Sequence, residues 1–200
     1  MKTQNFEKQL PDGYKTALYI NAKSPKFGII FNLIALAVLV VVMVVAVIPV
    51  LNKDVSVTVV DETPLLLVWV VFMAAMVAYI VLHELVHGIA YKALTGQKLT
   101  FGMSWSCAFC GVPDIYVYRR TALISLVSPL AVFTLILLPL TVWLYSVNLI
   151  YYFVSAFLLG LHLGGCSGDI YVLLLLLFRF RDKETLIKDT GPEQFFCTRE

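Results

Sequence analysis

Two histidines and a glutamate, at the spacing of a zinc-binding pentapeptide, are the residues best suited to chemistry in this chain. They form His83-Glu84-Leu85-Val86-His87, an H-E-x-x-H pattern. On a helix, residues i and i+4 share a face, so both imidazoles can reach one metal ion. Glu84, beside the first histidine, can take a proton from a metal-bound water. In a chain with three histidines, about 0.001 accidental matches are expected, so the pattern predicts a metal centre.

The segment around this pentapeptide is apolar, like most of the chain. Hydrophobic residues make up 60% of the 200 residues and charged residues only 14%, too few for the surface of a soluble domain. We predict an all-α polytopic membrane protein with one domain over residues 27–180, a preceding segment 1–26 and a tail 181–200. Four segments have the roughly 20 apolar residues that a spanning helix needs: 27–51, 64–91, 121–146 and 149–178.

The distribution of positive charge predicts an orientation. Lysines and arginines number 5, 1, 4, 0 and 5 in the successive segments outside the four spans. The positive-inside rule then places both termini and the loop between spans two and three in the cytoplasm. The net charge of +2 gives no electrostatic case for a nucleic-acid partner. We expect the protein to lie in the cell membrane. Its expected partners are the lipid bilayer and a membrane-protein or peptide substrate.

The loop between the second and third spans contains two strand-like runs. Residues 99–105 alternate larger apolar with small or polar side chains, and residues 115–118 form a second such run after Gly111 and Pro113. This pattern predicts a short β-hairpin or a re-entrant element. Between the runs, a single C-x-x-C at 107–110 is half of a zinc-ribbon site, and we interpret its cysteines as ordinary loop residues.

A third metal ligand is needed, because catalytic zinc usually has three protein ligands and a water. Asp169 is the only acidic residue within a span besides Glu84. At 1.5 Å per residue, His83 and Asp169 lie about 12 and 13 Å from the cytoplasmic ends of their spans, at matching depth. The glycine-rich run 164–168 predicts a local break before Asp169. The alternatives to a metal ligand are therefore a helix-capping carboxylate or an ion-pair partner for an arginine near the membrane face.

His162 is the second candidate for the third ligand. It lies two helical turns before Asp169, about 10 Å further from the cytoplasm if the helix is continuous. A single histidine in a span more often forms a hydrogen bond to a neighbouring helix. The residues therefore favour Asp169 and leave His162 as the alternative.

These motifs resemble a known family. H-E-L-V-H-G in a span, followed by a loop, two more spans and Gly168-Asp169, is similar to the membrane-embedded putative zincin peptidases, whose plan is like that of the site-2 proteases. The likeness covers about residues 65–178. It implies that His83, His87 and Asp169 hold Zn²⁺ and that Glu84 is the catalytic carboxylate. The chain lacks the Leu-Asp-Gly and Asn-x-x-Pro elements of site-2 proteases, so the zincin family is the closer likeness.

Together these features predict an intramembrane zinc metalloendopeptidase that hydrolyses a peptide bond in or near a transmembrane segment. A divalent-metal transporter or sensor could use the same ligands. The lack of an inverted repeat argues against a transporter, and the glutamate beside the first histidine argues for hydrolysis. A catalytically silent relative that binds membrane proteins is the third alternative.

Overall fold

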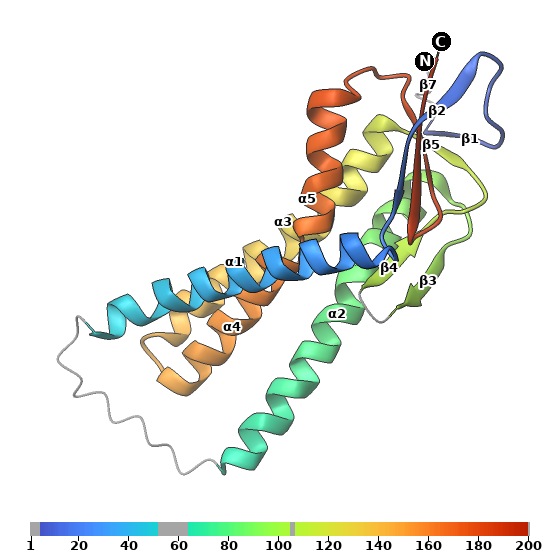
Figure 1. Ribbon diagram of the computed structural model, residues 1–200. Helices are drawn as coiled ribbons and strands as arrows, with labels where there is room; N and C mark the ends of the chain where they lie inside the picture. Colours follow the sequence, from blue (N-terminus) through green and yellow to red (C-terminus); the bar gives the residue numbers. More distant parts are fainter. Residues whose placement is uncertain (1–4, 52–63, 105–106, 200) are drawn as a thin grey trace. The chain divides into compact units, whose positions relative to one another are not determined.

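The protein has four helical segments long and apolar enough to cross a membrane, by length and composition, within the residues that the structure describes. This structure is a computed structural model, and it describes residues 5–51, 64–104 and 107–199. The prediction of four such helices is confirmed at that level. Their bounds, which follow the predicted spans closely, are Pro25–Leu51, Leu66–Thr95, Arg119–Leu144 and Leu149–Arg179 (Figure 1).

The fourth segment is not one continuous helix, whereas α1 (Pro25–Leu51), α2 (Leu65–Thr95) and α3 (Arg119–Leu144) are. It consists of α4 (Leu149–Gly165), α5 (Ser167–Leu174) and a π-helical turn, η1 (Leu175–Arg179). The interruption at Cys166 lies in the glycine-rich run, as predicted. Asp169 therefore lies in the first turn of α5, where the helix dipole favours a carboxylate.

Both ends of the chain form strands, so the all-α class was wrong in this respect. A five-stranded antiparallel sheet takes residues from the amino-terminal segment, the loop before α3 and the tail. The strands alternate only partly. All but one of the four strand pairs join segments far apart in the sequence, the exception being 186–189 with 193–199, so the sequence pattern did not reveal the sheet. The spatial order is β1 (Phe6–Glu7), β5 (Tyr116–Tyr118), β6 (Leu186–Asp189), β7 (Glu193–Arg199) and β2 (Tyr14–Asn21).

A hairpin does lie between α2 and α3, but its second strand is not the predicted one. β3 (Thr100–Met103) pairs with β4 (Ala108–Gly111), which contains most of the C-x-x-C segment. The run at 115–118 contributes β5, which pairs with β1 and β6 instead. β4 reads Ala-Phe-Cys-Gly, which carries no alternation, so periodicity did not identify it. Trp105, the end of the first predicted run, lies outside the described residues.

The described residues form two compact units. The sheet unit contains residues 5–31, 81–129 and 168–199, and the helix unit contains residues 32–51, 64–80 and 130–167. The core of the sheet unit joins side chains of α5 and η1 to the strands; fully buried members are Val117, Leu176, Ile187 and Phe196. This packing fixes the position of α5, and hence of Asp169, against the sheet.

In the helix unit, α1 and α4 approach closely at two glycines. A Cβ atom on Gly160 would lie 2.7 Å from Leu39 Cδ1, and one on Gly164 would lie 2.6 Å from the Ala35 carbonyl oxygen. Small residues four apart allow such contact between membrane helices. The Tyr152 hydroxyl also donates to the Ala46 carbonyl at 2.9 Å. α4 is thus held by close backbone approach and by polar contacts.

One buried carboxylate joins three parts of the sheet unit. Asp189, the last residue of β6, is 4% exposed. Its Oδ2 accepts a hydrogen bond from the Tyr91 hydroxyl at 2.7 Å and its Oδ1 accepts from the Gly191 N–H at 2.9 Å. Its backbone carbonyl accepts from the Val112 N–H at 2.8 Å. Burial raises the pKa of Asp189 to about 6, against the opposing effect of the hydrogen bonds from Tyr91 and Gly191.

This raised pKa predicts that the fold becomes less stable as pH rises through about 6. The stabilisation from protonated Asp189 is complete below the ordinary carboxyl pKa of 3.8 and is lost above the folded value of about 6. A shift of about two pKa units corresponds to about 3 kcal/mol of unfolding free energy. We expect the Tm in detergent to fall more between about pH 5 and about pH 8 for the wild type than for Asp189→Asn. Asp114→Asn, at an exposed site, is the control; parallel curves for wild type and Asp189→Asn would contradict the prediction.

Candidate metal centre

The two histidines of the pentapeptide lie on one face of α2, within the sheet unit. His83 is 8% exposed and His87 is 7% exposed, and their ring centroids are 5.1 Å apart. This arrangement follows from the helical spacing of four residues, which places the second ring one turn above the first. The structure therefore brings both predicted histidine ligands to one buried location.

Asp169 reaches the same location from the first turn of α5. Its Oδ2 lies 3.3 Å from His83 Nε2 and 3.4 Å from His87 Nε2. One ligand atom from each of the three residues lies within 4.8 Å of the other two, so the group could hold a metal ion. The break at Cys166 matters here, because it lets a new helix begin just before Asp169.

The separations fit the coordination geometry of zinc. Zinc binds imidazole nitrogen and carboxylate oxygen at about 2.0–2.1 Å and prefers tetrahedral sites, so two ligand atoms on one ion lie about 3.3–3.4 Å apart. The two separations from Asp169 Oδ2, 3.3 and 3.4 Å, have this value. Two imidazoles with one carboxylate are also a suitable donor set for zinc, and a fourth position remains for water.

The hydrogen bond of His87 leaves its other nitrogen available as a ligand. His87 Nδ1 lies 2.9 Å from the Ser125 carbonyl oxygen on α3. A carbonyl can only accept, so Nδ1 carries the proton and donates it. In the neutral ring, Nε2 then has a free lone pair, and this is the atom that faces Asp169. Sequence reasoning missed Ser125, because a backbone carbonyl acts here and the residue type gives no signal.

Glu84 is half-buried, directly after the first histidine. Its carboxylate lies in electrostatic range of both histidines and of Asp169. A carboxylate beside a metal site can hold a proton in transit, provided that it is not itself a ligand. The group of three candidate ligands does not include Glu84, so its carboxylate is available for this role.

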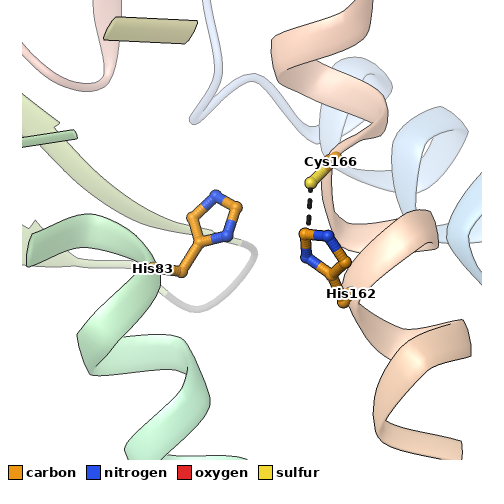
Figure 2. Close-up of side chains that lie close together, drawn as sticks. All are labelled: His83, His162 and Cys166. Carbon is orange, nitrogen blue, oxygen red and sulfur yellow. Dashed lines mark hydrogen bonds between the residues drawn. The ribbon is translucent and has the colours of Figure 1, made fainter. Parts of the chain in front are cut away.

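His162, the alternative third ligand, belongs to the helix unit and is fully buried there. Its Nδ1 lies 3.0 Å from the Tyr79 hydroxyl and 3.6 Å from Cys166 Sγ, and its Nε2 lies 3.1 Å from Thr134 Oγ1. Figure 2 shows the contact between the His162 ring and the side chain of Cys166, the residue directly after α4. These contacts agree with the interpretation of His162 as a residue that forms hydrogen bonds to neighbouring helices.

The β3–β4 hairpin packs on α2 next to the second histidine. A Cβ atom on Gly88 would lie 2.6 Å from Phe101 Cζ and 3.2 Å from Leu99 Cδ1, so these two side chains pack directly against the backbone of α2 at Gly88. Phe101 and Met103 of β3 are 49% and 72% exposed. Among the described strands, β4 alone pairs with β3. The other edge of β3 can therefore accept an extended segment near the candidate metal centre.

Helices of this length and composition, together with a buried group of histidines and a carboxylate, define a candidate membrane metalloenzyme. The family model described as "Putative zincin peptidase" matches residues 76–183, which is more than half of the chain. The chain therefore belongs to this family, as the resemblance in its motifs predicted, and the membership indicates a metallopeptidase that uses zinc. No curated protein and no solved structure matches the chain.

Proposed function

We propose that the protein is an intramembrane zinc metalloendopeptidase. The observation that carries the proposal is the meeting of His83, His87 and Asp169 at zinc-like separations, with Glu84 beside them. These residues lie on helices long enough to cross a bilayer. Membership of a metallopeptidase family supports the chemistry. The distribution of lysines and arginines supports an orientation with both termini and the loop between α2 and α3 in the cytoplasm.

Each residue of the candidate centre would have a distinct role in hydrolysis. His83 Nε2, His87 Nε2 and an oxygen of Asp169 would hold zinc, which, when bound, polarises a carbonyl and acidifies a water. The Ser125 carbonyl keeps the His87 ring oriented through Nδ1. The Glu84 carboxylate would accept the proton of the attacking water and pass it to the amine that leaves. The burial of both histidines limits competition from bulk water.

We further propose that the substrate segment binds as an added strand along the open edge of β3. A transmembrane helix hides its peptide bonds in internal hydrogen bonds, so it must unwind before hydrolysis. An edge strand can supply replacement hydrogen bonds to the extended segment. β3 packs on α2 one residue after His87, so a segment added there would lie close to the candidate metal ligands.

Removal of the Phe101 side chain tests this binding mode. Half of the ring is exposed, and covering that half by substrate is worth about 1 kcal/mol, or about fivefold in KM. We expect Phe101→Ala to raise KM about fivefold with unchanged zinc content. Phe178→Ala removes an exposed aromatic side chain outside the hairpin and is the control. An equal rise in KM for both variants would contradict the assignment to β3.

Comparison of membranes that contain active and inactivated protein tests the proposed function itself. New amino termini of membrane proteins are identified by mass spectrometry. Membranes that contain the wild type are compared with membranes that contain the double variant His83→Ala/His87→Ala. We expect termini in or near transmembrane segments that need the wild type, disappear with 1,10-phenanthroline and return with zinc. If no such termini appear, the peptidase proposal fails. Metal flux in proteoliposomes that survives Glu84→Gln would then favour a transporter, and metal binding with neither flux nor cleavage would favour a silent relative.

A further inference from the structure

A buried tyrosine continues the metal-binding face of α2. Tyr91 lies four residues after His87, as His87 lies four after His83, so the three side chains share one face. Tyr91 is 2% exposed, and its hydroxyl donates to Asp189 Oδ2 at 2.7 Å. Asp189 comes from the tail, at the end of β6. The turn of α2 after His87 is thus attached to a strand made from the last part of the chain.

Asp189 also controls the position of β4. Its backbone carbonyl accepts from the N–H of Val112, the residue after β4, and its Oδ1 fixes the turn at Gly191. A Cβ atom on Gly111 of β4 would lie 2.2 Å from the Gly191 nitrogen, so the strand and the turn are in direct backbone contact. Because β4 pairs with β3, Asp189 connects the metal-binding helix to the hairpin, with its carboxylate on Tyr91 and the Gly191 turn and its backbone carbonyl on Val112.

The charged form of the Asp189 carboxylate costs stability in this fold. Burial raises the pKa of Asp189 to about 6, so its charged form at neutral pH is unfavourable in this fold. A buried polar pair that costs stability, where an apolar pair could pack, is found most often where function requires a fixed geometry. Tyr91 and Asp189 have this character, and neither is a candidate metal ligand.

We propose that Tyr91 and Asp189 are a positioning pair whose hydrogen bond sets the location of the His87 turn relative to the β3–β4 hairpin. The inference rests on the proposed peptidase function. Through this pair, the five-stranded sheet supports the turn of α2 that carries His87. Loss of the bond lets the turn that carries His87 shift against Asp169, and residues that orient metal ligands typically contribute about 10- to 100-fold in metal affinity.

Cobalt(II) binding by the full-length protein tests the pair without a substrate. Co²⁺ reports ligand geometry through its visible absorption. We expect Tyr91→Phe to weaken Co²⁺ binding about tenfold and to change the absorption bands. The matched control is Tyr118→Phe, because the Tyr118 hydroxyl donates to Glu7 Oε1 at the same 2.7 Å, between β5 and β1. Tyr118→Phe is expected to bind Co²⁺ as the wild type does.

Asp189→Asn separates positioning from a purely structural role. We expect this variant to weaken Co²⁺ binding while its Tm at neutral pH is equal to or higher than that of the wild type. A structural role would lower both together. Wild-type affinity in both Tyr91→Phe and Asp189→Asn would overturn the positioning pair and leave the proposed function intact. Failure of the wild type to bind Co²⁺ would overturn the proposed function, and the positioning pair with it.

Discussion

Glu84→Gln is expected to reduce peptide cleavage by about 10²- to 10⁴-fold while the bound zinc remains. The amide has the shape of the carboxylate but cannot accept the proton of the attacking water. The ligands at His83, His87 and Asp169 are unchanged in this variant, so the metal content should equal that of the wild type. The measurement combines metal analysis of purified protein with counts of new amino termini in membranes.

A matched control comes from the end of the same helix. Lys92→Met removes an exposed charge from the last turn of α2 and should alter neither zinc content nor cleavage. Full cleavage by Glu84→Gln would contradict the role of general base. Loss of zinc from Glu84→Gln would show instead that this carboxylate holds the metal, which the separations do not predict.

Asp169→Ala is expected to lose zinc, whereas His162→Ala is expected to keep it. Asp169 Oδ2 lies 3.3 and 3.4 Å from the two histidine nitrogens. Its removal leaves two protein ligands, one fewer than catalytic zinc sites usually have. His162 instead has hydrogen bonds to Tyr79 and Thr134. Its replacement should lower the Tm, because it removes hydrogen bonds to the partly buried hydroxyls of Tyr79 and Thr134.

Metal analysis of both variants beside the wild type decides between the two candidates. We expect about one zinc per wild-type chain and less than about a tenth of that in Asp169→Ala. His162→Ala should remain near the wild-type value even where its Tm is lower. The reverse pattern, with zinc kept by Asp169→Ala and lost by His162→Ala, would move the third ligand to His162.

Local patterns in the sequence were enough to predict the long helices and the residues of the candidate centre. Spanning helices need only a run of apolar residues, and the composition of each run contains that information. The prediction that both histidines bind one metal ion needs only their spacing of four residues within a single helix. Asp169 was predicted as the third ligand from its distance to the cytoplasmic end of its span, which matches that of His83. The glycine-rich run predicted the break that places Asp169 in the first turn of α5.

The missed features depend on contacts between distant segments. β2 pairs with β7 from Tyr14↔Arg199 to Asn21↔Glu193, and neither strand shows the alternation that would predict it. Ser125 acts through its backbone carbonyl, which every residue has. Asp189 looked like one more acidic residue of a polar tail, because its burial depends on the sheet around it. Such contacts cannot be inferred from periodicity in one sequence.

The pairing of β2 with β7 also sets the order of events during synthesis. β2 leaves the ribosome before any long helix, but its partner β7 follows the last of them. The sheet unit, which contains both candidate histidines and Asp169, therefore cannot be completed before all four long helices have been synthesised. The candidate centre therefore reaches its full surroundings only after β7, the last strand of the sheet to be synthesised, has paired with β2.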